Sequence, residues 1–459
     1  MKKNSLLKTL GITFGIALLL SWAIKAGYYS NGTYTASDTI TPIGLYNLFS
    51  TPIMAMSLFF DVGLLFLAVG GFYGVLNKTG VYSNIIAKIV EKWKSKKTLF
   101  LTIVMVNFIL LSSLVGSTSL LLILVPFFTA ILLKLGYDKV TSFSATFGSI
   151  LIGEMGSLFG VDVWGMFKYY FSLQIGDLIL VRIVFLIMIS TLFILLVRKN
   201  GKNVKEEEIP LYVENKTKKD SLPLIIISIV SFILLLIGTY DWQNIFGITL
   251  FNSFHESIAN MSLVNNLLGG ATQLGLWSNI DIVIVLLILS IIISWIYSVK
   301  FNEALDGLKD GVKEMLLPAF YALMSYTVFA FIYNSISAGN GTFVETMINK
   351  ILGNAEKFET FKTALTAIVS SSTFSYFPLN LSYFASIFTS YDTEVLPSVA
   401  FIFQTMKGIV SLVIPTSFLL VGGLSYAKVS YKEWIKNIWF FILELLIIII
   451  LIFIILTIF

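Results

Sequence analysis

Apolar stretches recur along almost the whole chain, and many match the ~20 residues that an α-helix needs to cross a bilayer. A membrane β-barrel would instead show alternating segments of about ten residues, which the sequence lacks. The pattern predicts an all-α polytopic membrane protein with about eleven membrane elements. Continuous spans are expected at residues 6–27, 53–77, 177–197, 222–239, 282–299, 314–337 and 438–459, and interrupted spans at 140–160 and 397–424.

Two serine-rich segments interrupt this apolar pattern, Gly116-Ser117-Thr118-Ser119 and Ser370-Ser371-Ser372-Thr373. Each lies between apolar arms that are too short to form two ordinary spans. Non-helical polar backbone at membrane depth is tolerated only where protein or a water-filled cavity satisfies it. A matched pair of such interruptions, one in each half, therefore points to the binding site of a transporter.

The distribution of lysines predicts the orientation of these elements. This 459-residue chain is 57% hydrophobic and 12% charged, against about 25% charged residues in a soluble domain. By the positive-inside rule the Lys-rich segments are expected in the cytoplasm and the segments without Lys or Arg outside. The cytoplasmic set comprises the N-terminus, 78–97, 134–139, 198–220, 300–313 and 428–436, and the outer set comprises 28–52 and 240–281. Residues 98–135 then form a re-entrant hairpin that opens to the cytoplasm, and 363–390 form one that opens to the outside.

The same order of features occurs in both halves, which predicts two inverted repeats. Each half has a span, an amphipathic segment (78–97 or 341–362), a serine-rich hairpin tip and a broken span. The breaks are expected at 153–157 and 414–417. We therefore divide the chain into a first span with its outer loop, a first repeat, a cytoplasmic linker and a second repeat, at residues 1–52, 53–197, 198–221 and 222–459.

Helix breaks and hydroxyl groups suit a small anion and its coupling ion. The start of a half-helix carries free N–H groups that favour a carboxylate, and unwound carbonyls with hydroxyls favour Na⁺. The candidate substrate-binding residues are Ser117, Thr118, Ser119, Glu154, Ser371, Ser372, Thr373 and Asn380. The candidate ion-coupling residues, which also give a candidate Na⁺ site at the tips, are Gly116, Gly156, Ser157, Ser370, Pro415, Thr416 and Ser417. The alternative is that small Ser and Thr residues only pack helices and bond to their own backbone.

Two of the carboxylates within expected spans, Glu154 and Asp61, lie away from the span ends. Burying one in a membrane costs roughly 2.5–3.5 kcal/mol, so Glu154 is a functional candidate that would bind H⁺ or Na⁺ or a cationic amine of the substrate. The alternatives are a water-filled loop or a pairing with a lysine. Asp61 is equally compatible with a hydrogen-bonded structural role.

The chain lacks the residues that several classes of protein need for their function. The chain has no Cys and one His, and it contains no HExxH, GxSxG or Walker motif, so neither an enzyme nor a metal or organic cofactor is expected. An ATP-driven pump is excluded for this chain alone. The opposed hairpins argue against an ion channel, which remains the alternative of a different class. The lysines are expected to face anionic lipid rather than nucleic acid.

Four stretches carry a resemblance to a known family: 42–49, 70–80, 135–138 and above all 414–434, which begins Ile-Pro-Thr-Ser and ends Tyr-Lys-Glu-Trp. On these the chain resembles the YfcC-like family, which is related to the C4-dicarboxylate anaerobic carriers within the ion transporter superfamily. The resemblance implies a dimeric secondary transporter with two re-entrant hairpins, in which a transport domain moves like an elevator against a scaffold domain. Both hairpin tips depart from the family's pattern, which bears on the substrate.

We therefore expect a secondary transporter in a bacterial plasma membrane, with a cytoplasmic N-terminus, that moves a small carboxylate-bearing solute by Na⁺ or H⁺ coupling or by exchange. The acidic Glu154 and the absence of arginine from both hairpins favour an amino acid, including a basic one such as arginine exchanged for ornithine. The resemblance favours a C4-dicarboxylate or a short-chain carboxylate. Both substrate classes stay open at this point.

Overall fold

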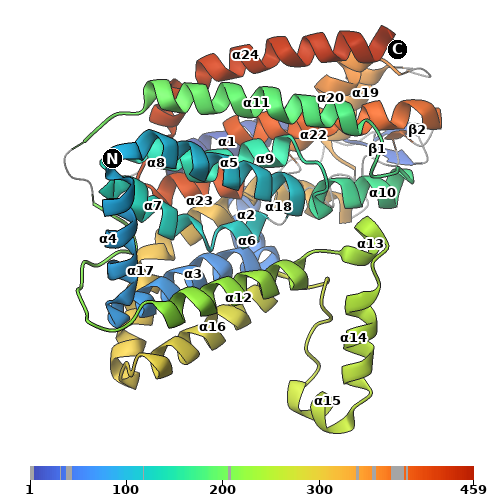
Figure 1. Cartoon of the computed structure of the whole chain (residues 1–459). Helices are drawn as coiled ribbons and strands as arrows, with labels where there is room; N and C mark the ends of the chain where they lie inside the picture. The colour runs from blue at the N-terminus through green and yellow to red at the C-terminus, as the bar shows by residue number, and fades with distance from the viewer. Residues whose placement is uncertain are drawn as a thin grey trace.

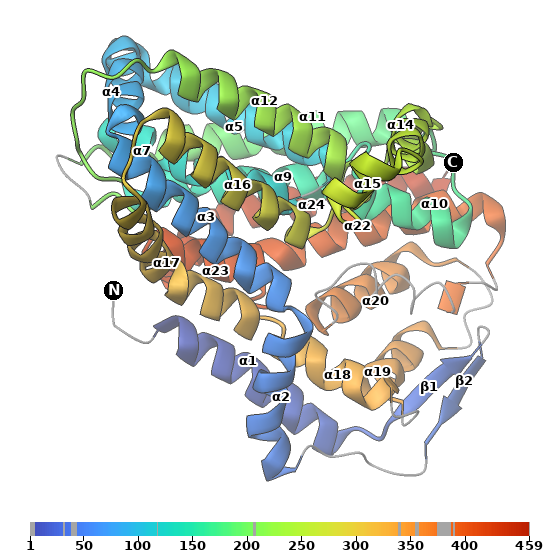
Figure 2. The same ribbon diagram turned by 90° about the horizontal axis from the view of Figure 1, so that it is seen from below.

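The computed structural model describes residues 5–30, 33–37, 44–116, 118–204, 208–337, 341–353, 358–373, 387–388 and 391–458, and these are mostly helical (Figures 1 and 2). The elements of the first half are α1 (Ser5–Ala23), β1 (Gly27–Ser30), β2 (Thr33–Ala36), α2 (Leu45–Leu58), α3 (Phe60–Thr79), α4 (Val81–Trp93), α5 (Lys97–Val115), α6 (Thr118–Leu121), α7 (Val125–Lys134), α8 (Lys139–Phe143), α9 (Ser149–Met155), α10 (Met166–Phe171) and α11 (Ile179–Asn200). Short π-helical turns, Ser144–Gly148 and Val161–Gly165, precede α9 and α10.

The second half continues with α12 (Leu222–Thr239), α13 (Trp242–Phe246), α14 (Leu250–Ala259), α15 (Ser262–Leu268), α16 (Asn279–Ile296), α17 (Phe301–Met324), α18 (Thr327–Ser337), α19 (Phe343–Leu352), α20 (Thr360–Thr373), α22 (Leu396–Val413), α23 (Phe418–Tyr426) and α24 (Tyr431–Ile458). Helices α12 and α16 form one layer together with α3, and α14 and α15 project away from the body (Figure 1).

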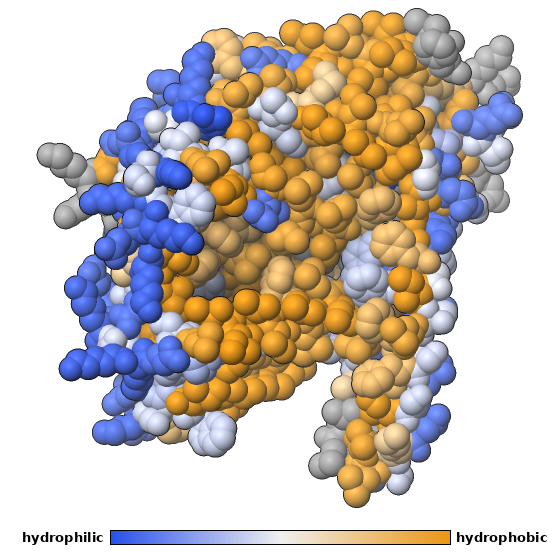
Figure 3. Space-filling model, in the orientation of Figure 1, coloured by the Kyte–Doolittle hydropathy of each residue, from blue (hydrophilic) through white to orange (hydrophobic). Residues whose placement is uncertain are grey.

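Nine helical segments within the described residues are long and apolar enough to cross a membrane. Their outer faces carry exposed hydrophobic side chains, such as Ile291 at 70% and Leu180 at 75% exposure. Figure 3 shows this as a broad apolar surface bordered by hydrophilic residues. The predicted polytopic helical membrane protein is therefore confirmed.

The structure adds three details to the sequence prediction. A small two-stranded antiparallel sheet, β1–β2, lies in the expected outer loop. Residue 52, where the first division of the chain was drawn, lies inside α2, which contains Pro52. Residues 301–313 of the Lys-rich segment 300–313 form the first turns of α17. There, buried Gly307 and Gly311 face α3 while the charged residues face outward, so the lysines mark the exposed face of a helix.

Helices α3 and α17 make a close backbone contact through two Gly-x-x-x-Gly pairs, Gly70 with Gly74 and Gly307 with Gly311. A Cβ atom built on Gly307 would lie 2.7 Å from the carbonyl oxygen of Gly74, and one on Gly74 or Gly311 would come closer still to the facing backbone. Small residues of this kind let membrane helices pack backbone to backbone. A hydrogen bond from Asn279 Nδ2 to Asp61 Oδ2 (2.7 Å) ties α16 to the same assembly, which fits the structural role considered for Asp61.

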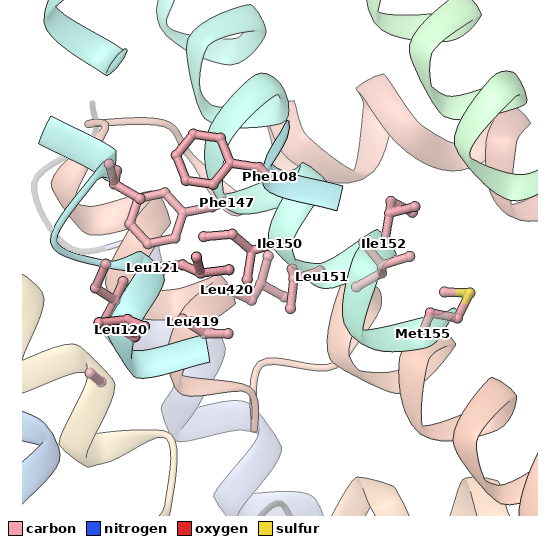
Figure 4. Close-up of a cluster of buried hydrophobic side chains, with 14 of the residues drawn as sticks. Phe108, Leu120, Leu121, Phe147, Ile150, Leu151, Ile152, Met155, Leu419 and Leu420 are labelled. Carbon is pink, nitrogen blue, oxygen red and sulfur yellow. The ribbon is translucent and has the colours of Figure 1, made fainter. Parts of the chain in front are cut away.

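Part of the apolar core joins the first hairpin to both broken spans. Figure 4 shows Leu120 and Leu121 of α6, Ile150 and Leu151 of α9 and Leu420 of α23 in one cluster. All five are completely buried. Three segments that are far apart in the sequence are thus fixed relative to one another by burial of apolar side chains.

The outer β-hairpin is fastened to α19 by Glu345. This buried carboxylate accepts hydrogen bonds from the backbone N–H of Tyr29 (3.1 Å) and from the backbone N–H (2.7 Å) and hydroxyl (3.1 Å) of Thr342. Tyr34 and Thr346 share a further hydroxyl contact at 2.8 Å. Burial raises the pKa of Glu345 to about 7, against the lowering effect of these hydrogen bonds.

We expect a leucine at Gly74 or Gly311 to destabilise the protein strongly, because either side chain would force α3 and α17 apart. Overpacking of a core costs about 1–3 kcal/mol. Gly11→Leu on α1 is the matched control, since nothing lies within 4 Å of a Cβ there. Thermal unfolding in detergent should show a lower Tm for the first two variants only. Equal Tm values for all three would contradict the close contact.

Glu345 should make stability depend on pH. Because its folded pKa is raised from 4.5 to about 7, the folded state binds the proton more tightly, and stability falls as pH rises through this window. The shift corresponds to an upper bound of about 3 kcal/mol. Wild-type Tm should decrease between pH 5 and pH 8 by more than that of Glu345→Gln. A parallel decrease in both proteins would show that another group is responsible.

Candidate functional site

The first broken span is interrupted between Met155, the last residue of α9, and Val161. Ser113 of α5 satisfies much of the exposed backbone there. Its hydroxyl donates to the carbonyl of Gly156 (2.8 Å), and its own carbonyl accepts from the N–H groups of Leu158 (2.9 Å) and Phe159 (3.2 Å). The end of the first hairpin arm therefore serves as the hydrogen-bonding partner of the break.

The tip of the first hairpin lies directly against this break. Gly116 ends α5 with φ +75°, and a Cβ on it would lie 2.7 Å from the carbonyl carbon of Gly160. Ser157 Oγ accepts from Gly160 N–H (3.1 Å). The structure thus brings the candidates Gly116, Gly156 and Ser157 together. Thr118 is buried and Ser119 half-buried beside them, whereas Ser117 lies outside the described residues.

Two side chains that sequence reasoning missed cover the carbonyls of the break. Gln404 of α22 donates through Nε2 to the carbonyls of Met155 (2.8 Å) and Ser157 (3.0 Å) and accepts from Trp164 Nε1 (2.6 Å). Arg182 of α11, completely buried, donates to the carbonyl of Leu158 and stacks 3.4 Å from the centroid of the Trp164 ring. A charged residue within an expected span is a functional candidate by default, so Arg182 could have been singled out from the sequence.

Glu154 forms an ion pair with Lys407 of α22, and this is the central electrostatic feature of the site. The two side chains are 16% and 11% exposed. The helices approach closely here, because a Cβ on Gly408 would overlap the side chain of Met155. A lysine partner for Glu154 was among the alternatives expected from the sequence, but its position was not predicted. Lys407 is the single charged residue of the expected span 397–424, a signal that was available.

Comparison with known proteins identifies the family of this chain. A family model described as "C4-dicarboxylate anaerobic carrier" (DcuC) matches residues 30–458. The chain belongs to this carrier family. The match confirms the YfcC-like, DcuC-related resemblance, and the family is one of transporters rather than enzymes.

One solved structure similar to this carrier-family chain is that of the Alcanivorax borkumensis YdaH transporter, described as having an unusual topology. It is 13% identical, with a TM-score of 0.38 over 96% of this chain and 95% of the other. The comparison with curated proteins found no match.

The second broken span of this carrier-family protein is interrupted at residues 414–417, as predicted. Ser417 caps α23 by accepting from Leu420 N–H (3.4 Å), and Pro415 and Thr416 are buried beside it. The carbonyl of Leu412, at the end of α22, accepts from Trp434 Nε1 (2.8 Å). One end of this break is therefore held by a helix cap and the other by a hydrogen bond from α24.

The second serine-rich segment differs from the first because it lies in the last turn of α20. Ser372 Oγ donates to the carbonyl of Ile368 (2.7 Å) and Thr373 Oγ1 to that of Val369 (2.9 Å). These two hydroxyls therefore bond to the backbone of their own helix, which was the alternative to a binding role. Ser370 and Ser371 are buried, and Ser371 Oγ has no hydrogen-bond partner within the described part of the chain. Asn380 lies outside that part.

The Glu154–Lys407 pair should behave as a coupled unit in stability measurements. Lys407→Met leaves a buried carboxylate without its ammonium partner, which costs about 3–5 kcal/mol, whereas Glu154→Gln/Lys407→Met removes both charges. We expect the double variant to recover most of the lost Tm. Lys78→Met is the control, since the Lys78–Asp310 pair (3.2 Å) is solvent-exposed and such pairs contribute about 0–1 kcal/mol. Additive effects in the double variant would contradict the coupling.

Proposed function

We propose that this protein is a secondary active transporter of a small carboxylate-bearing solute, and that Lys407 binds the carboxylate of the substrate. The observation that carries the proposal is the Glu154–Lys407 ion pair, which joins the two broken spans at membrane depth. Membership of the C4-dicarboxylate anaerobic carrier family supports it.

The ion pair suggests how substrate binding and ion coupling are linked. A lysine in a largely buried position needs an anionic partner. Glu154 supplies that partner in the substrate-free arrangement, and a substrate carboxylate would supply it in the loaded one. Glu154 then loses its cation and has to be neutralised by H⁺ or Na⁺. Exchange of Glu154 for the substrate carboxylate on Lys407 would thereby couple binding of the anionic substrate to binding of a cation.

The pair favours a C4-dicarboxylate more than the sequence alone did. Glu154 was the reason to expect a cationic substrate, and Lys407 already balances its charge. Lys407 also provides the cation that neither hairpin supplies. We propose that the hydroxyls of the hairpin tips, Thr118, Ser119 and Ser371 among them, contact the rest of the substrate, and that the coupling ion binds near Ser157 and Ser417.

An amino acid is the second candidate, on a specific observation. The ammonium and carboxylate groups of a zwitterion complement Glu154 and Lys407, respectively, so an opened ion pair would offer one partner to each. This candidate requires both charges for binding. The dicarboxylate candidate requires Lys407 for binding and Glu154 only for coupling.

The proposed transport domain contains the hairpins and broken spans, and the proposed scaffold contains α3, α12, α16 and α17. The order α3, α4, α5–α7, α8–α10, α11 in residues 53–197 parallels α17–α18, α19, α20, α22–α23, α24 in residues 222–459. This parallel supports inverted repeats joined by the linker 198–221 and an elevator-like movement. A homodimer in a bacterial inner membrane, with a cytoplasmic N-terminus, completes the proposal.

Uptake into proteoliposomes tests the proposal. Wild type should take up a labelled C4-dicarboxylate saturably and faster with an inward H⁺ or Na⁺ gradient. Lys407→Met should reduce uptake at least about tenfold, equivalent to 1.4 kcal/mol. Lys407→Arg should retain more uptake than Lys407→Met, Glu154→Gln should lose the gradient effect but keep binding, and Lys78→Met should match wild type.

Different outcomes separate the candidates. Saturable uptake of amino acids, lost in both Glu154→Gln and Lys407→Met, would favour the zwitterion. Normal uptake by a folded Lys407→Met protein would overturn the role of Lys407. A wild-type protein that transports neither substrate class, or that conducts ions without saturation, would contradict secondary transport.

A further inference from the structure

A large apolar groove lies between the layer of α3, α12 and α16 and the arm formed by α6 and α7. Its volume is about 350 Å³, and its walls include Tyr73, Tyr82, Phe127, Ser228 and Leu286. Figure 3 shows the molecule hollowed here, next to a hydrophilic border. We propose that this groove binds an acyl chain of an anionic phospholipid whose headgroup lies at the Lys-rich end. The proposal does not depend on the transported substrate.

The lining suits a hydrocarbon chain and not water. All of its residues are uncharged and most are aliphatic or aromatic. The hydroxyl of Tyr73 is already used, since it donates to the carbonyl of Ile123 at 2.7 Å. Apolar cavities of this kind stay free of water. Because the groove is built from membrane-spanning helices, lipid acyl chains are the apolar ligands that surround it.

The groove opens sideways toward the lipid. Ile225, Ile229 and Ile233 line it and are 40%, 56% and 50% exposed, so the same face of α12 belongs to the groove wall and to the outer apolar surface. An acyl chain can therefore enter from the bilayer without crossing a polar barrier.

Lysines gather at one end of the groove. Ile85 of α4 lines it, and Lys88 follows on the same face of that helix. The linker is held there by a hydrogen bond from Asn84 Nδ2 to the carbonyl of Thr217 (2.6 Å), which places Lys216 and Lys218 beside α4. Lys88, Lys216 and Lys218 are all exposed. Basic residues at this depth attract anionic headgroups.

The nearby acidic groups do not cancel this charge. Glu91, Glu214 and Asp220 are the acids of the same region. Glu214 is paired with Lys134 (2.6 Å), and Asp220 Oδ1 accepts from the backbone N–H of Leu222 (3.1 Å). Lys219 is engaged with the carbonyl of Tyr297. Apart from the Glu214–Lys134 pair, the four charges of Lys88, Lys216, Lys218 and Lys219 stand against the two of Glu91 and Asp220, so this end of the groove keeps a positive charge. This excess of positive charge favours an anionic lipid over a zwitterionic one.

Photo-crosslinking tests the site. The full-length protein is reconstituted with phosphatidylglycerol that carries a diazirine at the end of one acyl chain, or with the matching phosphatidylcholine, and labelled peptides are mapped by mass spectrometry. We expect phosphatidylglycerol to label the wall residues of α7 and α12 at least fivefold more than the outer face of α16. Ser228→Trp, which fills the groove, should abolish this enrichment, whereas Ile291→Trp on the outer face should not.

The lysines are tested separately with Lys88→Gln/Lys218→Gln, which should remove the preference for phosphatidylglycerol over phosphatidylcholine. Folding of each variant is checked by its elution profile and Tm. Equal labelling of groove and outer face would overturn the site. Equal labelling by the two lipids in wild type would overturn the anionic specificity, and protein–protein crosslinks through the groove would assign it to a second copy of the chain.

Discussion

The fold depends on the requirement that every backbone polar group at membrane depth finds a partner inside the protein. At the break after α9 the carbonyls of Met155, Gly156 and Ser157 accept hydrogen bonds from side chains of other helices. Those donors come from α5 and α22, and α11 adds Arg182. A single interrupted span therefore fixes the positions of three others. An interruption at this place without these partners would be costly.

The same contacts limit what the break can do. Its carbonyls already accept hydrogen bonds from neutral or cationic protein groups, which reduces the coordination that they can offer to an ion. The charges of the site that oppose each other directly are Glu154 and Lys407. Buried ion pairs often contribute little net stability, because desolvation offsets their attraction. A pair that contributes little net stability is compatible with the partner exchange that we propose for Lys407.

Local features of the sequence predicted the spans, the two breaks and the helical arms of the first hairpin, because length, hydropathy and glycine or proline content act over a few residues. The partners of Glu154 and of the break were not predicted. Gln404 and Lys407 are about 250 residues away from the residues that they contact, and a sequence contains no direct record of which helices meet. The second serine-rich segment looked like the first in composition, yet its hydroxyls bond within α20. Composition cannot distinguish these two uses of serine.

The proposed movement has a natural boundary in this structure. Helices α3 and α17 are in close backbone contact through their glycines, and α9 contacts α22 closely at Gly408, so in the proposed movement each pair would shift as a unit. Apolar contacts join α23 to the α3–α17 pair: Gly422 packs on Phe66 of α3, and Phe418 stacks against Tyr326, which follows α17. Tyr73 of α3 adds a hydrogen bond to the carbonyl of Ile123 in the first hairpin (2.7 Å). Apolar surfaces of similar shape can shift without leaving a polar group unpaired. The apolar groove continues the same boundary on its other side. A lipid chain in the groove would keep its apolar walls buried while the two units shift relative to each other. A rigid protein–protein contact at the same place would not allow that shift.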